Sequence, residues 1–163
     1  MVEVQKYFKA ERRGGVLLLI LGTFFLCVSF YFLGMERFSY SVGFSISFIV
    51  IALIQLGVGI VIFVRSPKDL ARVEGYVNNS KESIQGKEIP RMKKVMRSFT
   101  IYLLLELILI IIGFLLLFVF NLGTLSEGLG LGLIIQTSIM LVFDLFALRR
   151  GRKYVTYLKK LDF

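Results

Sequence analysis

The sequence predicts an all-α, polytopic membrane protein: a four-transmembrane-helix bundle with amphipathic helices at its cytoplasmic face. The first observation is a set of four apolar runs, residues 14–34, 42–64, 99–120 and 129–148. A membrane-spanning helix needs ~20 mostly apolar residues at ~1.5 Å each, and every run reaches that length. The second is that 56% of the 163 residues are hydrophobic. A soluble domain would not carry four such runs, so we expect one membrane domain over residues 1–163.

The third observation is the placement of charge. The net charge is +9, and all but one of the 20 Lys and Arg residues lie in residues 1–13, 65–98 and 149–163. The exception is Arg37, between the first two runs. Cytoplasmic segments carry the excess of Lys and Arg, so both ends and the central loop are predicted in the cytoplasm, with the protein in the inner membrane. Without RNA- or DNA-binding motifs, this charge indicates topology rather than nucleic-acid binding.

The basic residues that flank the runs also suit anionic lipid headgroups, which attract a Lys or Arg by ~1 kcal/mol near the surface. Besides the lipid bilayer, we expect a protein partner or a homo-oligomer. The predicted headgroup contacts are Lys9, Arg12, Arg13, Lys93, Lys94, Arg97, Arg149 and Arg150.

Residues 1–13 have the pattern of an amphipathic helix that lies in the headgroup region. Val4, Tyr7 and Phe8 share one face, while basic residues lie elsewhere. Such a helix rests with its apolar face toward the hydrocarbon. Gly14–Gly15 then predicts a flexible corner into the first span.

The central loop begins with a helix-start pattern. Ser66 suits an N-cap, Pro67 the first helical position and Asp69 the third, which predicts a second interfacial helix over residues 66–76. The basic tail, residues 149–163, is amphipathic in the same way. Its apolar residues expected to face lipid are Tyr154, Tyr157, Leu158 and Leu161.

Two short connections predict how the spans pair. Residues 35–41 and 121–128 are too short for anything but antiparallel neighbours, so spans one and two pair, as do spans three and four. Gln55 and Gln136 occupy matching places in spans two and four. This indicates two parallel two-helix repeats related by an axis along the membrane normal. The alternative is chance similarity between membrane helices.

Glu106 and Asp144 are acids inside spans three and four. A charge at the bilayer centre costs ~2.5–3.5 kcal/mol, so each of these acids calls for a structural or functional explanation. Glu106 lies ~10 Å inside its span by helical rise. It is interpreted as a proton or cation site, an anchor for a partner helix, or an acid hydrogen-bonded inside the bundle. Asp144, ~6 Å deep, is expected to pair with Arg149 or Arg150 or to reach the interface. A polar pocket opening inward between the two spans is a further expectation.

Gln55 and Gln136 lie near the middle of their spans. An amide there seeks an interhelical hydrogen bond of ~0.6 kcal/mol, and the alternative is that the pair lines a substrate path. Small residues recur along the same helices, which favours close helix packing within the bundle, a homodimer seam being the alternative. These small residues include Gly15, Gly22 and Ser29, Ser47 and Gly59, and Gly128 and Gly132.

The composition excludes most catalytic sites. The chain has no His and one Cys, so a Ser-His-Asp or Cys-His arrangement cannot form. It contains no HExxH motif, no P-loop and no dinucleotide fingerprint. Glu106 and Asp144 are nominal candidates for an intramembrane aspartyl mechanism, but no motif supports them. We therefore expect no enzyme, no cofactor and no metal.

These features lead to one hypothesis and two alternatives. The hypothesis is a non-enzymatic integral membrane protein that binds a partner in or at the membrane, as an accessory subunit or an immunity-type protein. The first alternative is a small oligomeric transporter or channel with Glu106 as its intramembrane carboxylate. The second is a membrane protein that binds anionic lipid through its basic helices.

Overall fold

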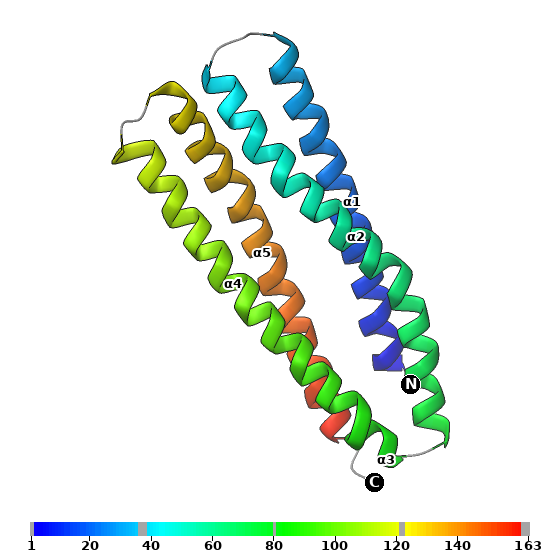
Figure 1. Ribbon diagram of the computed structural model, residues 1–163. Helices are drawn as coiled ribbons and strands as arrows, with labels where there is room; N and C mark the ends of the chain where they lie inside the picture. The colour runs from blue at the N-terminus through cyan, green and yellow to red at the C-terminus, as the bar shows by residue number, and fades with distance from the viewer. Residues whose placement is uncertain (1, 36–38, 80, 121–122, 161–163) are drawn as a thin grey trace.

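The computed structural model describes residues 2–35, 39–79, 81–120 and 123–160 and consists of four long helices, shown in Figure 1. All four are long and apolar enough to cross a membrane, which confirms the predicted all-α, four-helix architecture. The long helices are α1 (Val2–Met35), α2 (Ser39–Asn79), α4 (Ile89–Phe118) and α5 (Thr124–Lys160). Between α2 and α4 lie α3 (Lys81–Ser83) and a π-helix, η1 (Ile84–Glu88).

The four helices form two antiparallel hairpins, as predicted. Helix α1 packs on α2 and α4 packs on α5, and the hairpins meet mainly through α2 and α5, which run parallel (Figure 1). We call the end where α1 leads into α2 and α4 into α5 the hairpin end. The opposite end, built from residues 2–13, 65–98 and 149–160, is the charged end. The connections predicted at 35–41 and 121–128 include residues 36–38 and 121–122, which lie outside the described residues.

Small residues bring α2 and α5 together at the hairpin end. A Cβ on Gly43 would meet the carbonyl oxygen of Leu125, and one on Gly128 would meet that of Tyr40. Ser47 Oγ donates a hydrogen bond to the Leu129 carbonyl oxygen at 2.9 Å. Backbones approach this closely only where side chains are small. These small residues therefore pack inside one chain, as the sequence analysis favoured.

Small residues also allow close helix packing inside each hairpin. A Cβ on Gly15 of α1 would lie 3.1 Å from the carbonyl oxygen of Gly59 in α2. A Cβ on Gly113 of α4 would lie 2.9 Å from that of Gly130 in α5. Each hairpin is thus a tightly packed pair, and the space left in the bundle lies between the pairs.

The predicted corner at Gly14–Gly15 and the predicted helix start at Ser66 are both wrong. Helix α1 runs without a break from Val2, and α2 continues through Ser66 and Pro67. The glycines are buried because they allow close packing, and Ser66 Oγ donates to the Phe8 carbonyl oxygen at 2.8 Å instead of capping a helix. The tail is likewise a continuation of α5.

The apolar faces of these extensions pack on one another. Val4 and Phe8 are buried in the bundle, so the prediction that this face of residues 1–13 rests toward the hydrocarbon is wrong. Tyr154 and Leu158 are buried, so the expectation that they face lipid is wrong; Tyr157 is half-buried, and Leu161 lies outside the described residues. The Tyr7 and Tyr154 rings stack with centroids 4.2 Å apart. Extensions from α1, α2, α4 and α5 converge, and each supplies one apolar face. This charged-end core contains Val4, Phe8, Val73, Ile84, Met92, Tyr154, Val155 and Leu158.

Candidate functional site

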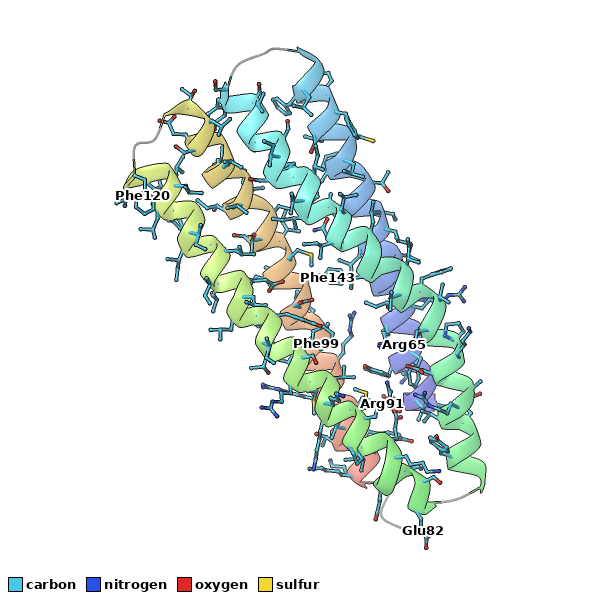
Figure 2. All side chains as sticks on the ribbon, in the orientation of Figure 1. Arg65, Glu82, Arg91, Phe99, Phe120 and Phe143 are labelled. Carbon is cyan, nitrogen blue, oxygen red and sulfur yellow. The ribbon has the colours of Figure 1, made fainter. Side chains whose placement is uncertain are left out.

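A cavity of about 730 Å³ lies between the two hairpins, on the charged-end side of the Gln55–Gln136 level. All four long helices line it. Figure 2 shows Phe99 and Phe143 on the α4–α5 side and Arg65 on the α1–α2 side. Most of the lining is apolar. Its charged residues are Glu11, Arg65, Glu106, Asp144 and Arg150.

The cavity exists because the hairpins are joined at both ends and diverge between them. At the hairpin end, glycine and serine hold α2 against α5. Farther along, Gly57 of α2 lines the cavity, and no heavy atom lies within 4 Å of the place a Cβ would take on it. Gly57 thus faces open space, unlike Gly43 on the same helix, which packs on α5.

Glu106 of α4 and Asp144 of α5 meet in this cavity. Each is only 8% exposed, and their carboxyl groups lie within hydrogen-bonding reach of one another. Two carboxyl groups this close hold at most one negative charge between them, because two charges so close repel strongly. Glu106 Oε2 is buried and has no hydrogen-bond partner among the described residues. We call these two residues the carboxyl pair.

The ion pair predicted between Asp144 and Arg149 or Arg150 is absent from the described part of the chain. Asp144 faces α4, whereas Arg149 is exposed and Arg150 Nη2 would lie 3.2 Å from a Cβ on Gly14 of α1. The carboxyl pair therefore has no basic side chain within ion-pair distance. The prediction was a polar pocket between spans three and four, whereas the cavity of the structure is mostly apolar, and α1 and α2 supply its opposite wall.

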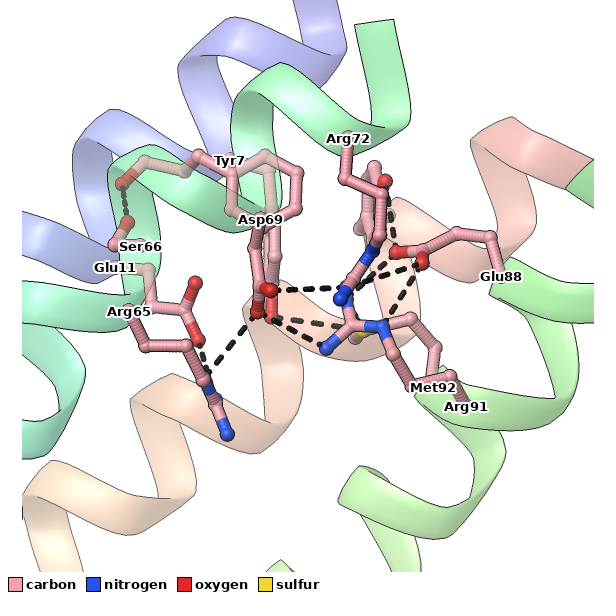
Figure 3. Close-up of polar contacts among 11 residues, drawn as sticks. Tyr7, Glu11, Arg65, Ser66, Asp69, Arg72, Glu88, Arg91 and Met92 are labelled. Carbon is pink, nitrogen blue, oxygen red and sulfur yellow. Dashed lines mark hydrogen bonds and ion pairs between the residues drawn. The ribbon is translucent and has the colours of Figure 1, made fainter. Parts of the chain in front are cut away.

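A second polar group, the ion-pair cluster, joins the helices at the charged end (Figure 3). Glu88 is 1% exposed, and its Oε1 lies 2.6 Å from Arg91 Nη2. Arg91 Nη1 also lies 3.3 Å from Asp69 Oδ2. Asp69 in turn contacts Arg65 at 3.2 Å and Arg72 at 2.9 Å. The cluster thus connects α2 to η1 and to the start of α4.

The same cluster reaches the remaining two helices. Tyr154 of α5 donates a hydrogen bond to Glu88 Oε1 at 3.3 Å, and Arg65 lies 3.4 Å from Glu11 of α1. This cluster was not predicted, because the pattern over residues 65–98 indicates a cytoplasmic loop with an interfacial helix over 66–76 rather than extensions of the spans that converge. The available signal was acids three or four positions from arginines, as in Arg65 with Asp69 and Glu88 with Arg91.

Gln55 and Gln136 meet on the α2–α5 seam, as predicted for interhelical contacts. Gln136 Nε2 donates to Gln55 Oε1 at 3.4 Å. With its amide rotated, Gln136 instead bonds the backbone of α2, at Phe48 O (3.3 Å) and Ala52 N (3.2 Å). Both side chains are fully buried, and neither lines the cavity. Their position matches helix-to-helix contact rather than a substrate path.

The basic residues predicted to touch headgroups are exposed, with one exception. Lys9, Arg12, Arg13, Lys93, Lys94, Arg97 and Arg149 are exposed, whereas Arg150 is half-buried and lines the cavity. The Arg12 guanidinium lies 4.6 Å from the centroid of the Phe63 ring. Contact with headgroups stays a prediction. Among the described residues, no group of three or more His, Cys, Asp or Glu side chains could hold a metal ion.

No protein-family model, curated protein or solved structure matches the chain. The functional proposal therefore starts from the geometry of the cavity.

Proposed function

We propose that the protein is a non-enzymatic, multi-pass membrane protein that binds a partner within the bilayer, in the cavity between its hairpins. The observation that carries this proposal is the cavity itself, about 730 Å³ among the apolar parts of all four helices. Sites for small molecules have volumes of roughly 300–1,000 Å³ and mostly apolar walls with a few polar groups. By the placement of charge, the charged end faces the cytoplasm of a cell with an inner membrane.

The length of the cavity favours a small amphiphilic molecule over a protein helix. On α2 the lining runs from Ile54 to Arg65, about 17 Å by helical rise, whereas a helix that spans the bilayer crosses about 30 Å of hydrocarbon. An accessory subunit or a toxin bound by an immunity-type protein would instead have to dock on the outer, lipid-facing surface. Among the described residues, that surface carries many exposed large apolar side chains, as contact with lipid alone would require.

Binding is also favoured over transport. A transporter must open its site to both sides of the membrane, but the α2–α5 seam closes the hairpin end. Opening it would separate Gly128 from Tyr40 and break the contact between Gln55 and Gln136. Lipid binding through the exposed basic residues is compatible with a ligand in the cavity and does not account for the carboxyl pair.

The test fills the cavity with a large side chain. Ala147 lines the cavity, while the adjacent Phe146 points away from it and is 57% exposed. Natural protein, Ala147→Trp and Phe146→Trp would be extracted with their surrounding lipid, and the small molecules that accompany each would be identified by mass spectrometry. We expect a molecule present with the natural chain and Phe146→Trp and lost from Ala147→Trp.

Val58→Trp places an equally large side chain on the opposite wall of the cavity. With two such variants, the conclusion does not depend on the folding of either one alone. Thermal unfolding shows that the variants compared are folded. Identical small molecules in all four samples would contradict binding in the cavity. Aspartic proteases also use two neighbouring carboxyl groups, so cleavage of a peptide in the cavity would overturn the non-enzymatic part of the proposal.

A further inference from the structure

We propose that the ligand of this cavity is a lipophilic organic cation, whose charged group contacts Glu106 and Asp144 and whose apolar body contacts the aromatic wall. This inference rests on the proposed function and names the chemical class that the cavity accepts. It applies to molecules with one amine or quaternary ammonium or phosphonium group and a largely apolar body.

The first argument is the carboxyl pair, which no basic side chain among the described residues neutralises. The carboxyl pair can hold one negative charge in an apolar setting, with no Lys or Arg within ion-pair distance among the described residues. Glu106 is more than nine-tenths buried and lines the cavity, and its Oε2 has no hydrogen-bond donor among the described residues. A buried carboxyl group is normally satisfied by a donor or a cation, so the pair marks a place for one in this cavity. One positive charge on the ligand would balance the pair.

The second step is the wall around that charge. Phe99 and Tyr102 of α4 and Phe143 of α5 line the cavity together with aliphatic residues of α2. Aromatic faces attract cations, and an apolar wall favours an apolar body. A hard metal ion fits poorly, because such cations require six or more oxygen ligands and the pair offers two carboxyl groups. The third carboxyl group of the lining, that of Glu11, already lies 3.4 Å from Arg65.

The third step concerns the two arginines that also line the cavity. Arg65 is already bound to Glu11 at 3.4 Å and to Asp69 at 3.2 Å. Arg150 lies against Gly14 of α1, nearer the charged end than the carboxyl pair. An anionic amphiphile would therefore be drawn to Arg150, whereas a cation would lie deeper between α4 and α5. The sign of the charge on a bound probe separates these two outcomes.

The experiment compares two probes of nearly equal size and opposite charge. Binding of tetraphenylphosphonium and tetraphenylborate would be measured by equilibrium dialysis against the protein in phosphatidylcholine nanodiscs, with empty nanodiscs subtracted. We expect saturable binding of tetraphenylphosphonium, at least tenfold tighter than that of tetraphenylborate. Ala147→Trp should abolish it and Phe146→Trp should leave it unchanged.

The carboxyl variants test the site directly. Glu106→Gln and Asp144→Asn each leave one carboxyl group to hold the charge, so each should weaken binding less than the double variant. The double variant has no charge left in the pair and should weaken binding more than tenfold. Glu127→Gln makes the same change on α5 at the hairpin end, outside the cavity lining, and should bind like the natural chain.

The outcomes distinguish this inference from the proposed function. If both probes bind equally and Ala147→Trp blocks both, the cavity binds amphiphiles but the cation inference is overturned. Undiminished tetraphenylphosphonium binding by the double variant also overturns it. If neither probe binds while the natural chain still retains a molecule that Ala147→Trp loses, the binding function stands and the ligand class is wrong.

Discussion

Two buried glutamates in the same polypeptide show opposite solutions to the burial of an acid. Glu88 contacts Arg91 at 2.6 Å and accepts a hydrogen bond from Tyr154. Among the described residues, Glu106 has Asp144 as its acidic neighbour, and its Oε2 has no hydrogen-bond donor. A fully paired buried acid holds a structure together, whereas an unpaired one costs stability and is available to a ligand. We therefore assign stability to Glu88 and binding to Glu106.

Replacing Glu88 should destabilise the protein strongly. Glu88→Leu leaves the Arg91 guanidinium without its closest partner, and breaking a buried ion pair costs about 3–5 kcal/mol; because Arg91 is partly exposed, we expect about 2–4 kcal/mol. The measurement is reversible unfolding in detergent, with Glu82→Leu at an exposed position as control. Equal stability of the Glu88 and Glu82 variants would show that the ion-pair cluster does not hold the charged end together.

Replacing Glu106, in contrast, should change the free energy of unfolding only a little. Glu106→Leu removes one of two acids that cannot both be charged and substitutes an apolar side chain of similar size, while Asp144 can stay neutral by binding a proton. We therefore expect the unfolding free energy to stay within about 1 kcal/mol of the natural value. The same unfolding measurement applies. A loss as large as that of Glu88→Leu would mean that Glu106 is a structural residue, against its assignment to ligand binding.

At the scale of helices, the position of each glycine decides how close two helices lie. Gly43 and Gly57 are both on α2, yet the first packs on Leu125 and the second faces the cavity. The sequence predicts the spans and the small-residue contacts well, because both depend on local composition. It fails at Gly14–Gly15 and Ser66, because distant partners such as Phe8 determine whether the helix continues there.

Alanine at these two glycines should give different results. Gly43→Ala forces α2 away from α5, and overpacking of this kind costs about 1–3 kcal/mol. Gly57→Ala meets no atom and should be neutral or slightly stabilising, because glycine disfavours helix by up to about 1 kcal/mol relative to alanine. Thermal unfolding of the two variants in one detergent checks this. Similar behaviour of both would argue against the close α2–α5 seam.

The contact between the two residues of the carboxyl pair could not be predicted from the sequence. Glu106 and Asp144 were each identifiable as acids in apolar runs. Their contact depends on how α4 and α5 are aligned, which no local pattern encodes. The ion-pair cluster was hidden for the same reason, because Asp69, Glu88 and Arg91 come together only when α2 and α4 converge.

At the scale of the whole molecule, the bundle is joined at both ends and hollow between them. Glycine and serine contacts hold the hairpin end, and the ion-pair cluster with its apolar core holds the charged end. This arrangement keeps the cavity among apolar helix segments, where molecules dissolved in the bilayer can reach it. A ligand that enters is therefore expected to come from the membrane rather than from water.

Orientation in the membrane can be tested by labelling. Cys27 is the only cysteine in the sequence, so a Cys27→Ala variant has none. Single cysteines are then introduced into this variant, by Glu82→Cys at the charged end or by Thr124→Cys at the hairpin end. With the charged end in the cytoplasm, a membrane-impermeant maleimide added to intact cells should label the Thr124→Cys chain. It should label the Glu82→Cys chain only after the membrane is opened. Labelling of the Glu82→Cys chain in intact cells would reverse the proposed orientation.

The most direct measurement is the location of a bound probe by NMR in nanodiscs. With methyl-labelled protein, we expect nuclear Overhauser contacts from tetraphenylphosphonium to Met140 and Ala147, which line the cavity between the hairpins. Ile111 on the exposed face of α4 should show none. Contacts confined to Ile111 and other lipid-facing methyl groups, with none to Met140 or Ala147, would contradict a binding site between the hairpins.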